Sequence, residues 1–129
     1  MRINVLEYLE KTASERPDRI AVIDGGVEID FRTLVERAKK LALFIHEKLG
    51  GVIRAPIAVY LPKSAESVIA DTAILFSGNC YMNLDVKSPI SRVNAVIKQT
   101  SPVLLITDDK HLEAVAGGGG YSKRTELLI

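Results

Sequence analysis

The sequence predicts an α/β fold: a three-layer arrangement in which a mostly parallel sheet carries helices on both faces, preceded by an N-terminal helix and a β-hairpin. Three short apolar segments, PIAVYLP, CYMNL and VLLIT, have the length of strands, and segments of helical periodicity alternate with them. This order is typical of parallel strands joined by right-handed crossovers. The continuously apolar run VLLIT also suits a strand that is covered on both faces.

Residues 1–30 predict a helix followed by a hairpin. Asn4 can cap the helix, apolar residues recur at helical spacing after it, and Pro17 ends the pattern. The segment IAVIDGGVEIDF then contains two β-branched runs around Gly25 and Gly26. Because glycine accepts the positive φ that a tight hairpin turn demands, we expect antiparallel strands on either side of this pair.

Two helices flank the first strand of the predicted sheet. Asp30 is a good N-cap residue, the apolar stripe after it runs over residues 31–49, and a Gly-Gly pair ends the helix. After the strand PIAVYLP, Ser64 caps the next helix, whose apolar residues recur on one side.

The second half of the chain predicts two more helices around the strand VLLIT. Pro89 stands where the first helical position is expected, and the apolar pattern continues to Thr100. Asp108 or Asp109 caps the short helix KHLEAVA. We expect residues 1–129 to form a single domain, because a chain of this length supports one hydrophobic core.

Four glycines at residues 117–120 raise the question of a phosphate loop. Such a loop follows a strand and opens a helix, because it uses the free N–H groups and the positive dipole end of that helix. Here the glycines follow a helix and precede residues 121–129, a possible last strand, and neither GxxxxGK[ST] nor GxGxxG occurs. We therefore interpret residues 117–120 as a flexible linker.

The composition excludes several classes of protein. The chain is 47% hydrophobic and 26% charged, has a formal net charge of +1 and contains no tryptophan or basic stripe, so we expect no nucleic-acid partner. No apolar run reaches the roughly 20 residues of a membrane span. The first helix carries Glu7 and Glu10 instead of a signal-peptide core. A single cysteine, Cys80, fits a reducing compartment, and we expect a cytoplasmic protein.

The sequence offers little support for a metal site or a nucleophile. His46 and His111 are the only histidines, whereas structural zinc usually takes four protein ligands, so we expect no bound metal. We expect His46 at the boundary of its apolar stripe and His111 on a charged surface helix. No GxSxG turn occurs. Cys80, beside bulky apolar neighbours, is predicted to be a small buried residue, with a reactive thiol as the alternative.

Asp85 follows the strand CYMNL, at the edge where open α/β sheets place ligands. We favour a structural role in which its carboxylate accepts backbone N–H groups and shapes the turn. Arg92, in the first turn of the next helix, is poorly placed for the helix dipole and either pairs with Asp85 or contacts an anion. Lys63 ends the preceding strand and Lys87 lies in the loop after Asp85, so both can face the same edge.

Two long segments share their order of features with one protein family. In ASERPDRIAVIDGGVEIDFRTLVERAKKLALFI, a helix ending in Arg-Pro-Asp leads to a hairpin, an aromatic residue and a helix with leucine and arginine. In IAVYLPKSAESVIADTAILFSGNCYMNLD, a strand ending in Leu-Pro leads to a helix and a small-Gly-x-x-Tyr-x-x-x-Asp signature, here Ser77, Gly78, Tyr81 and Asp85. Over residues 4–110 the chain resembles the opening of adenylate-forming (AMP-binding) ligases: acyl-CoA synthetases and the adenylation domains of peptide synthetases.

The resemblance implies a chemistry for which this chain lacks the central residues. The family activates a carboxylate with ATP and Mg²⁺ to an acyl-adenylate and transfers the acyl group to a thiol, and its phosphate loop and catalytic lysine lie further downstream. No Ser/Thr-Gly-Thr-Thr-Gly-Lys-type loop occurs here, so no catalytic residue is carried over. The family also usually has proline where this chain has Asn83 and Val86, which alters the fine shape of the loop between them.

We therefore expect an N-terminal structural subdomain of an ATP-dependent carboxylate-adenylating ligase, inactive by itself, as a truncated product or one chain of a split enzyme. Its expected partners are the remainder of the ligase or a complementary chain, and CoA or a carrier protein for the complete enzyme. In the CoA-using branch of the family, basic residues near this edge can meet the CoA nucleotide, and the resemblance makes Lys63, Lys87 and Arg92 the candidates for such an anion-facing or CoA-facing edge. An uncovered sheet edge predicts self-association. The alternatives are a stand-alone interaction or regulatory module of the same fold, and a small flavodoxin-like enzyme.

Overall fold

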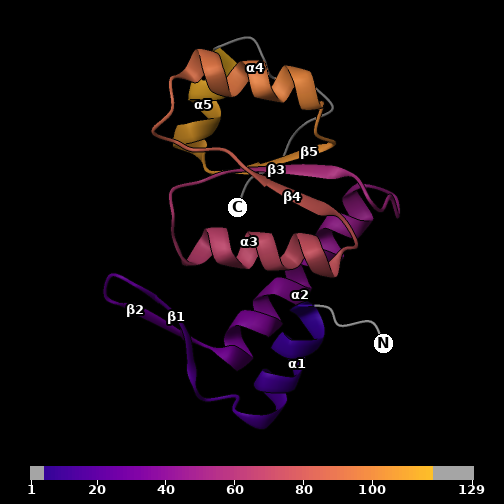
Figure 1. The fold of residues 1–129 in the computed structure, drawn as a ribbon, viewed down its shortest axis with the longest axis vertical. Helices are drawn as coiled ribbons and strands as arrows, with labels where there is room; N and C mark the ends of the chain where they lie inside the picture. Colours follow the sequence, from indigo (N-terminus) through magenta and orange to yellow (C-terminus); the bar gives the residue numbers. More distant parts are fainter. Residues whose placement is uncertain (1–4, 118–129) are drawn as a thin grey trace.

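The computed structural model describes residues 5–117 of the 129 (Figure 1). Its five helices and five strands alternate largely as the sequence predicts. In chain order they are α1 Val5–Glu15, β1 Ile20–Asp24, β2 Val27–Asp30, α2 Phe31–Lys48, β3 Pro56–Tyr60, α3 Ala65–Phe76, β4 Cys80–Asn83, α4 Ile90–Thr100, β5 Leu104–Thr107 and α5 Asp109–Gly117.

The sheet has β3 at its centre, with β4 on one side and β5 on the other. Both pairings are parallel, with Ile57 opposite Tyr81 on β4 and opposite Leu104 on β5. Parallel neighbours require crossover connections, and α3 and α4 supply them. The predicted parallel sheet is therefore confirmed.

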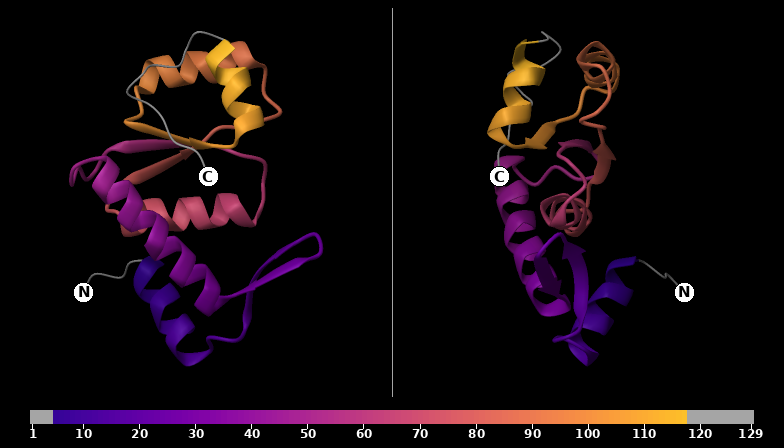
Figure 2. Two further views of the ribbon diagram at one scale, coloured as in Figure 1. Left: turned by 180° about the vertical axis from the view of Figure 1, so that it is seen from behind. Right: turned by 90° about the vertical axis from the view of Figure 1, so that its left-hand side faces the viewer.

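Helices cover both faces of this sheet, as Figures 1 and 2 show. On one face Ile57 and Val59 of β3 pack with buried residues of α2 and α3. On the other face Ala58 and Tyr60, the alternate residues of the same strand, pack with α4 and Val115 of α5. The alternation follows from the period-2 geometry of a strand, and it gives the predicted three-layer α/β arrangement.

The hairpin forms where the sequence predicts it. Strands β1 and β2 pair antiparallel around Gly25, which has a φ of 60°. Ile29 of the hairpin packs with Ile69 of α3 in a third apolar cluster. The Asp24 carboxylate at the end of β1 also accepts the N–H of Ala65, the first residue of α3, at 3.0 Å. The hairpin is thus joined to α3 by packing and by a helix cap.

The predicted caps at Asp30, Ser64 and Asp108 are confirmed, Pro89 lies one position earlier than predicted, and the predicted cap at Asn4 lies outside the described residues. Asp30 accepts the backbone N–H of Thr33 at 2.7 Å, and Ser64 forms a capping box with Ser67. Asp108 caps α5 by accepting the backbone N–H of His111 at 2.8 Å. Pro89 stands one residue before the helix and not at its first position, because its carbonyl already accepts the first helical bonds.

Two predictions fall at the edges of the structure. Gly117 is the last residue of α5, so the first glycine of the predicted linker is helical. The remaining glycines, 118–120, and the predicted last strand, 121–129, lie outside the described residues. Among residues 5–117, no helix is long and apolar enough to span a membrane.

Cys80 is exposed, so the prediction that it is a small buried residue is wrong. Edge position alone is not the reason, because β4 and β5 are both edge strands of the described sheet and β5 is buried along its whole length. Of the four residues of β4, only Met82 packs against an apolar cluster, while Cys80, Tyr81 and Asn83 are exposed. The described helices therefore cover β5 but leave most of β4 uncovered.

The loop between α3 and β4 is a tightly bonded structure. Gly78 has a φ of 81°, and a Cβ at this position would lie 3.2 Å from Cγ2 of Ile53. Buried Asn79 accepts the N–H of Ala55 at 2.9 Å and donates from Nδ2 to three oxygens of residues 52 and 77. The small-Gly part of the signature therefore holds the entry to β3 against the entry to β4.

We predict that Gly78→Ala lowers the free energy of unfolding by about 1–3 kcal/mol, because alanine is strained at this φ and its methyl group presses on Ile53. Denaturant titration measures this. Gly26→Ala is the control, since that position has no positive φ and nothing within 4 Å, and we expect a change within about 0.5 kcal/mol. Equal effects of the two substitutions would contradict the prediction.

We predict that replacing the two buried asparagines of the described chain by leucine changes the free energy of unfolding in opposite directions. Asn94 of α4 is only 7% exposed, and neither Nδ2 nor Oδ1 has a hydrogen-bond partner in the described part of the chain. Asn94→Leu should therefore raise the free energy of unfolding by about 1 kcal/mol, whereas Asn79→Leu should lower it by about 2–4 kcal/mol because it leaves buried partners unpaired. Thermal and denaturant unfolding check both, and destabilisation by Asn94→Leu would refute the first.

Candidate functional site

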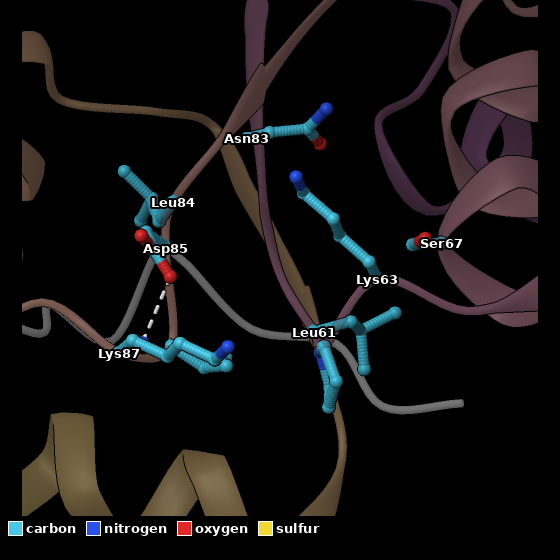
Figure 3. Close-up of a pocket in the computed structure, with 9 residues that line it drawn as sticks. Leu61, Lys63, Ser67, Asn83, Leu84, Asp85 and Lys87 are labelled. Atoms are coloured by element: carbon cyan, nitrogen blue, oxygen red, sulfur yellow. Dashed lines mark hydrogen bonds between the residues drawn. The ribbon is translucent and has the colours of Figure 1, made fainter.

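The principal pocket lies where β3 and β4 end, at the carboxyl edge of the sheet (Figure 3). Its volume is about 540 Å³. Two loops form it, one after each strand, together with one residue of α3 and the last residue of β4. The lining residues are Leu61, Pro62, Lys63, Ser67, Asn83, Leu84, Asp85, Val86 and Lys87. Open parallel sheets bind ligands at this edge, because the loops there diverge over a rigid base.

Lys63 and Lys87 enter the pocket from opposite loops. Figure 3 shows Lys63 extending toward Asn83, and Lys87 extending from the loop after β4 toward Leu61. Both residues are exposed, and within residues 5–117 neither takes part in an ion pair. The structure therefore places two of the three predicted basic residues around one pocket.

Asp85 shapes the turn that carries Lys87. Its Oδ1 accepts the backbone N–H of Lys87 at 2.9 Å, and its carbonyl accepts the N–H of Ser88 at 3.1 Å. No ion pair joins Asp85 to Arg92 within the described residues, so that suggested pairing is wrong. A carboxylate bonded to backbone donors in this way is typical of a turn-forming Asp.

Arg92 lies on a neighbouring pocket of about 210 Å³. Three residues, Asn83, Leu84 and Asp85, line both pockets and form the wall between them. The predicted basic set is therefore divided, with the two lysines on one side of this wall and Arg92 on the other.

A polar pair that sequence reasoning missed lies beside the larger pocket. Asn83 donates from Nδ2 to Oδ2 of Asp71, on α3, at 3.0 Å. Burial raises the pKa of the Asp71 carboxyl, and the hydrogen bond from Asn83 offsets part of that shift. Oδ1 of Asp71 is buried without a hydrogen-bond partner in the described part of the chain. The only local signal was the departure of Asn83 from the proline usual in the family.

A second polar cluster lies at the same edge, around His111. Its side chain is 16% exposed, its Nδ1 lies 2.6 Å from Oδ1 of Asp108, and its ring meets Tyr60 edge-on with centroids 5.5 Å apart. His111 thus lies on a helix with exposed charged residues, as expected, but its own side chain is half-buried. Burial raises the pKa of Tyr60, and the charge of Asp85 adds to that shift. For Asp108 burial acts upward, but hydrogen bonds from His111 lower the pKa overall.

The raised pKa of Asp71 predicts a pH dependence. The folded chain binds the proton of this carboxyl more tightly than the unfolded chain does. The free energy of unfolding therefore falls as pH rises from below 3.8 to above the folded-state pKa. Because asparagine does not titrate, Asp71→Asn should gain stability relative to the wild type over that window. Urea unfolding at several pH values measures the difference.

Asp30→Asn is the comparison variant for Asp71→Asn, because the pKa of Asp30 is shifted in the opposite direction. The backbone N–H of Thr33, followed by the Thr33 side chain, lowers the pKa of Asp30, so this variant should lose stability relative to the wild type as pH rises. Parallel pH profiles for the two variants would contradict both assignments.

Comparison with known proteins identifies the family. Residues 9–128 match the family model described as AMP-binding enzyme. A dimodular nonribosomal peptide synthase of Bacillus subtilis (strain 168) is 35% identical over 105 residues, which cover 81% of this chain and 4% of that protein. Tyrocidine synthase 1 of Brevibacillus parabrevis is 26% identical over 125 residues, covering 97% of this chain and 11% of that protein. The chain thus spans a small part of the length of these relatives.

Solved structures agree on the fold. A nonribosomal peptide synthetase in an α-methyl-L-serine-AMP bound form has a TM-score of 0.86 at 20% identity, covering 98% of this chain and 14% of that one. A putative long-chain-fatty-acid CoA ligase from Rhodopseudomonas palustris CGA009 has a TM-score of 0.85 at 18% identity, covering 98% and 32%. The matching family model and the shared α/β architecture establish that this chain belongs to the AMP-binding enzymes, the adenylate-forming ligases.

Proposed function

We propose that this chain forms a non-catalytic α/β part of a carboxylate-adenylating ligase and does not adenylate by itself. One observation carries the proposal. The carboxyl-edge pocket combines two lysines without ion pairs and one turn-forming carboxylate, but no group in it is arranged to transfer a phosphoryl or acyl group. A pocket of this kind can contact a charged ligand without carrying out chemistry on it.

Membership of the AMP-binding enzymes implies a bound nucleotide, and with it Mg²⁺. Hard divalent cations take several oxygen ligands, commonly carboxylates. Residues 5–117 contain no group of three or more His, Cys, Asp or Glu that could hold a metal ion. Asp85 is the one carboxylate lining the pocket, and its Oδ1 is bonded to the backbone. The described residues do not fit a nucleotide–magnesium centre, and no step through one is assigned to them.

The proposed contribution of Lys63, Lys87 and Arg92 is electrostatic. Cations at the mouth of a pocket attract anions and hold them in place. In the complete ligase, these residues would meet the phosphate groups of the thiol acceptor, either CoA or the phosphorylated arm of a carrier protein. Both acceptors find support among the similar proteins, since one is a putative CoA ligase and another contains adenylation and PCP domains.

The proposed partners are the remainder of the ligase or a complementary chain, in the cytoplasm. A stand-alone interaction module of the same fold is the second candidate. It is favoured by large exposed apolar side chains near the end of α2 and in the loop after it, which suit association with another protein or another copy. These residues are Leu43, Phe44, Val52 and Ile53.

ATP–pyrophosphate exchange tests the proposal. The 129-residue chain alone should show only background exchange with a panel of amino and fatty acids. Fused to the complementary remainder of an adenylation domain, it should restore exchange by orders of magnitude, because the phosphate-binding and catalytic groups are then present. The remainder without this chain is the control. Exchange by the isolated chain would overturn the proposal, and failure of every fusion to restore exchange would favour the interaction module.

A further inference from the structure

Asn83 is the polar residue that the function above leaves unexplained. It is the last residue of β4, it lines both pockets, and its side-chain amide bonds Asp71 of α3. An amide carries both a donor group and an acceptor oxygen. Asn83 therefore gives the pocket wall an uncharged polar group.

We propose that Asp71 fixes the side-chain amide of Asn83 so that its oxygen faces the pocket beside Lys63, and that the pocket thereby selects anions with a hydrogen-bond donor next to the charge. This rests on the proposed anion contact of the lysines and names the ligand class for it: a phosphorylated group with an adjacent hydroxyl or N–H.

The hydrogen bond determines which way the amide points. An ionised carboxylate can only accept hydrogen bonds, so the group of Asn83 that lies 3.0 Å from Asp71 must be the NH₂. The amide oxygen is then on the opposite side of the planar group. In Figure 3 the end of the Asn83 side chain and the amine of Lys63 extend toward one another across the pocket.

Asp71 is suited to hold this orientation because it is itself held. It lies within α3, whose first residues are fixed by the Ser64 capping box and by Asp24. One of its oxygens is buried without a partner in the described part of the chain, while the other bonds Asn83. The carboxylate therefore has no competing donor among the described residues to draw it from Asn83. Asp71 acts on the ligand only through Asn83, so it is a positioning residue.

The neutral acceptor complements the charges around it. Lys63 and Lys87 offer donors only, and Ser67 is already occupied by its bonds with Ser64. Asp85 could accept a hydrogen bond, but its negative charge repels an anion. The amide oxygen of Asn83 is therefore the acceptor in this pocket that can receive a donor next to an anionic group without electrostatic penalty.

The test compares two probes of equal charge, sn-glycerol 3-phosphate and propyl phosphate, which differ in the hydroxyl groups next to the phosphate. Binding to the 129-residue chain is followed by NMR chemical shifts. The wild type should bind the glycerol ester about twofold to tenfold more tightly, the value of one hydrogen bond. Asp71→Ala should lose this preference and keep its affinity for propyl phosphate. Glu66→Ala, which removes the same charge from the same helix, should keep the preference.

A second readout separates positioning from binding. The side-chain NH₂ signals of Asn83 should move strongly in Asp71→Ala and stay in place in Glu66→Ala. If Asp71→Ala does not fold, Asp71→Leu serves instead, since it removes both acceptor oxygens and fills the space of the side chain.

Three outcomes would overturn the inference. Equal affinity of the wild type for the two esters refutes the selectivity and leaves the anion contact of the lysines intact. Absence of binding by both esters refutes the anion contact and the selectivity together. Unchanged Asn83 amide signals in Asp71→Ala refute the positioning role of Asp71, whichever ester binds.

Discussion

The structure depends on the burial of one short strand. β3 is hydrogen-bonded along both sides and covered on both faces, so its four last residues, Ile57 to Tyr60, are almost completely enclosed. Its alternate side chains belong to two different apolar clusters. Residues of α2 and α3 complete one cluster, and residues of α4 and α5 complete the other. The Thr107 hydroxyl donates to the Tyr60 carbonyl at 2.6 Å, which also ties the ends of β3 and β5 together. Since both site loops leave the sheet next to this strand, its position determines theirs.

Local signals in the sequence predicted the elements well, because capping residues, glycine pairs and apolar periodicity act over a few residues. What failed depends on contacts between distant residues. The composition of a strand does not show which helices will cover it, so the exposure of Cys80 on β4 was missed, while β5 at the other edge of the described sheet is buried. His111 is half-buried because its ring contacts Tyr60 of β3 edge-on, although the rest of its helix is largely exposed. Both features arise where tertiary placement overrides local pattern.

The same distinction applies to the site. Lys63, Lys87 and Asp85 could be assigned to one pocket because parallel strands end at a common edge, a rule of topology. The separation of Arg92 from the two lysines depends on the path of a loop. The hydrogen bond between Asp71 and Asn83 joins α3 to β4. Neither feature produces a periodic pattern in the sequence. The sequence thus predicted the two loops that form the site and the charged residues that they carry. It missed the hydrogen bond by which Asp71 holds the uncharged side chain of Asn83.

The bond between Asp24 and the N–H of Ala65 gives the hairpin a mechanical role. Asp24 is the last residue of β1, and its carboxylate accepts a hydrogen bond from the first residue of α3, forty-one positions later in the chain. Opening of the first turn of α3 therefore requires either that the hairpin follow it or that this bond break, so fluctuations of the two segments are correlated. A contact that displaces the hairpin tip, from a neighbouring domain or another molecule, would therefore also move the first turn of α3. That turn contains Ser67, which lines the pocket.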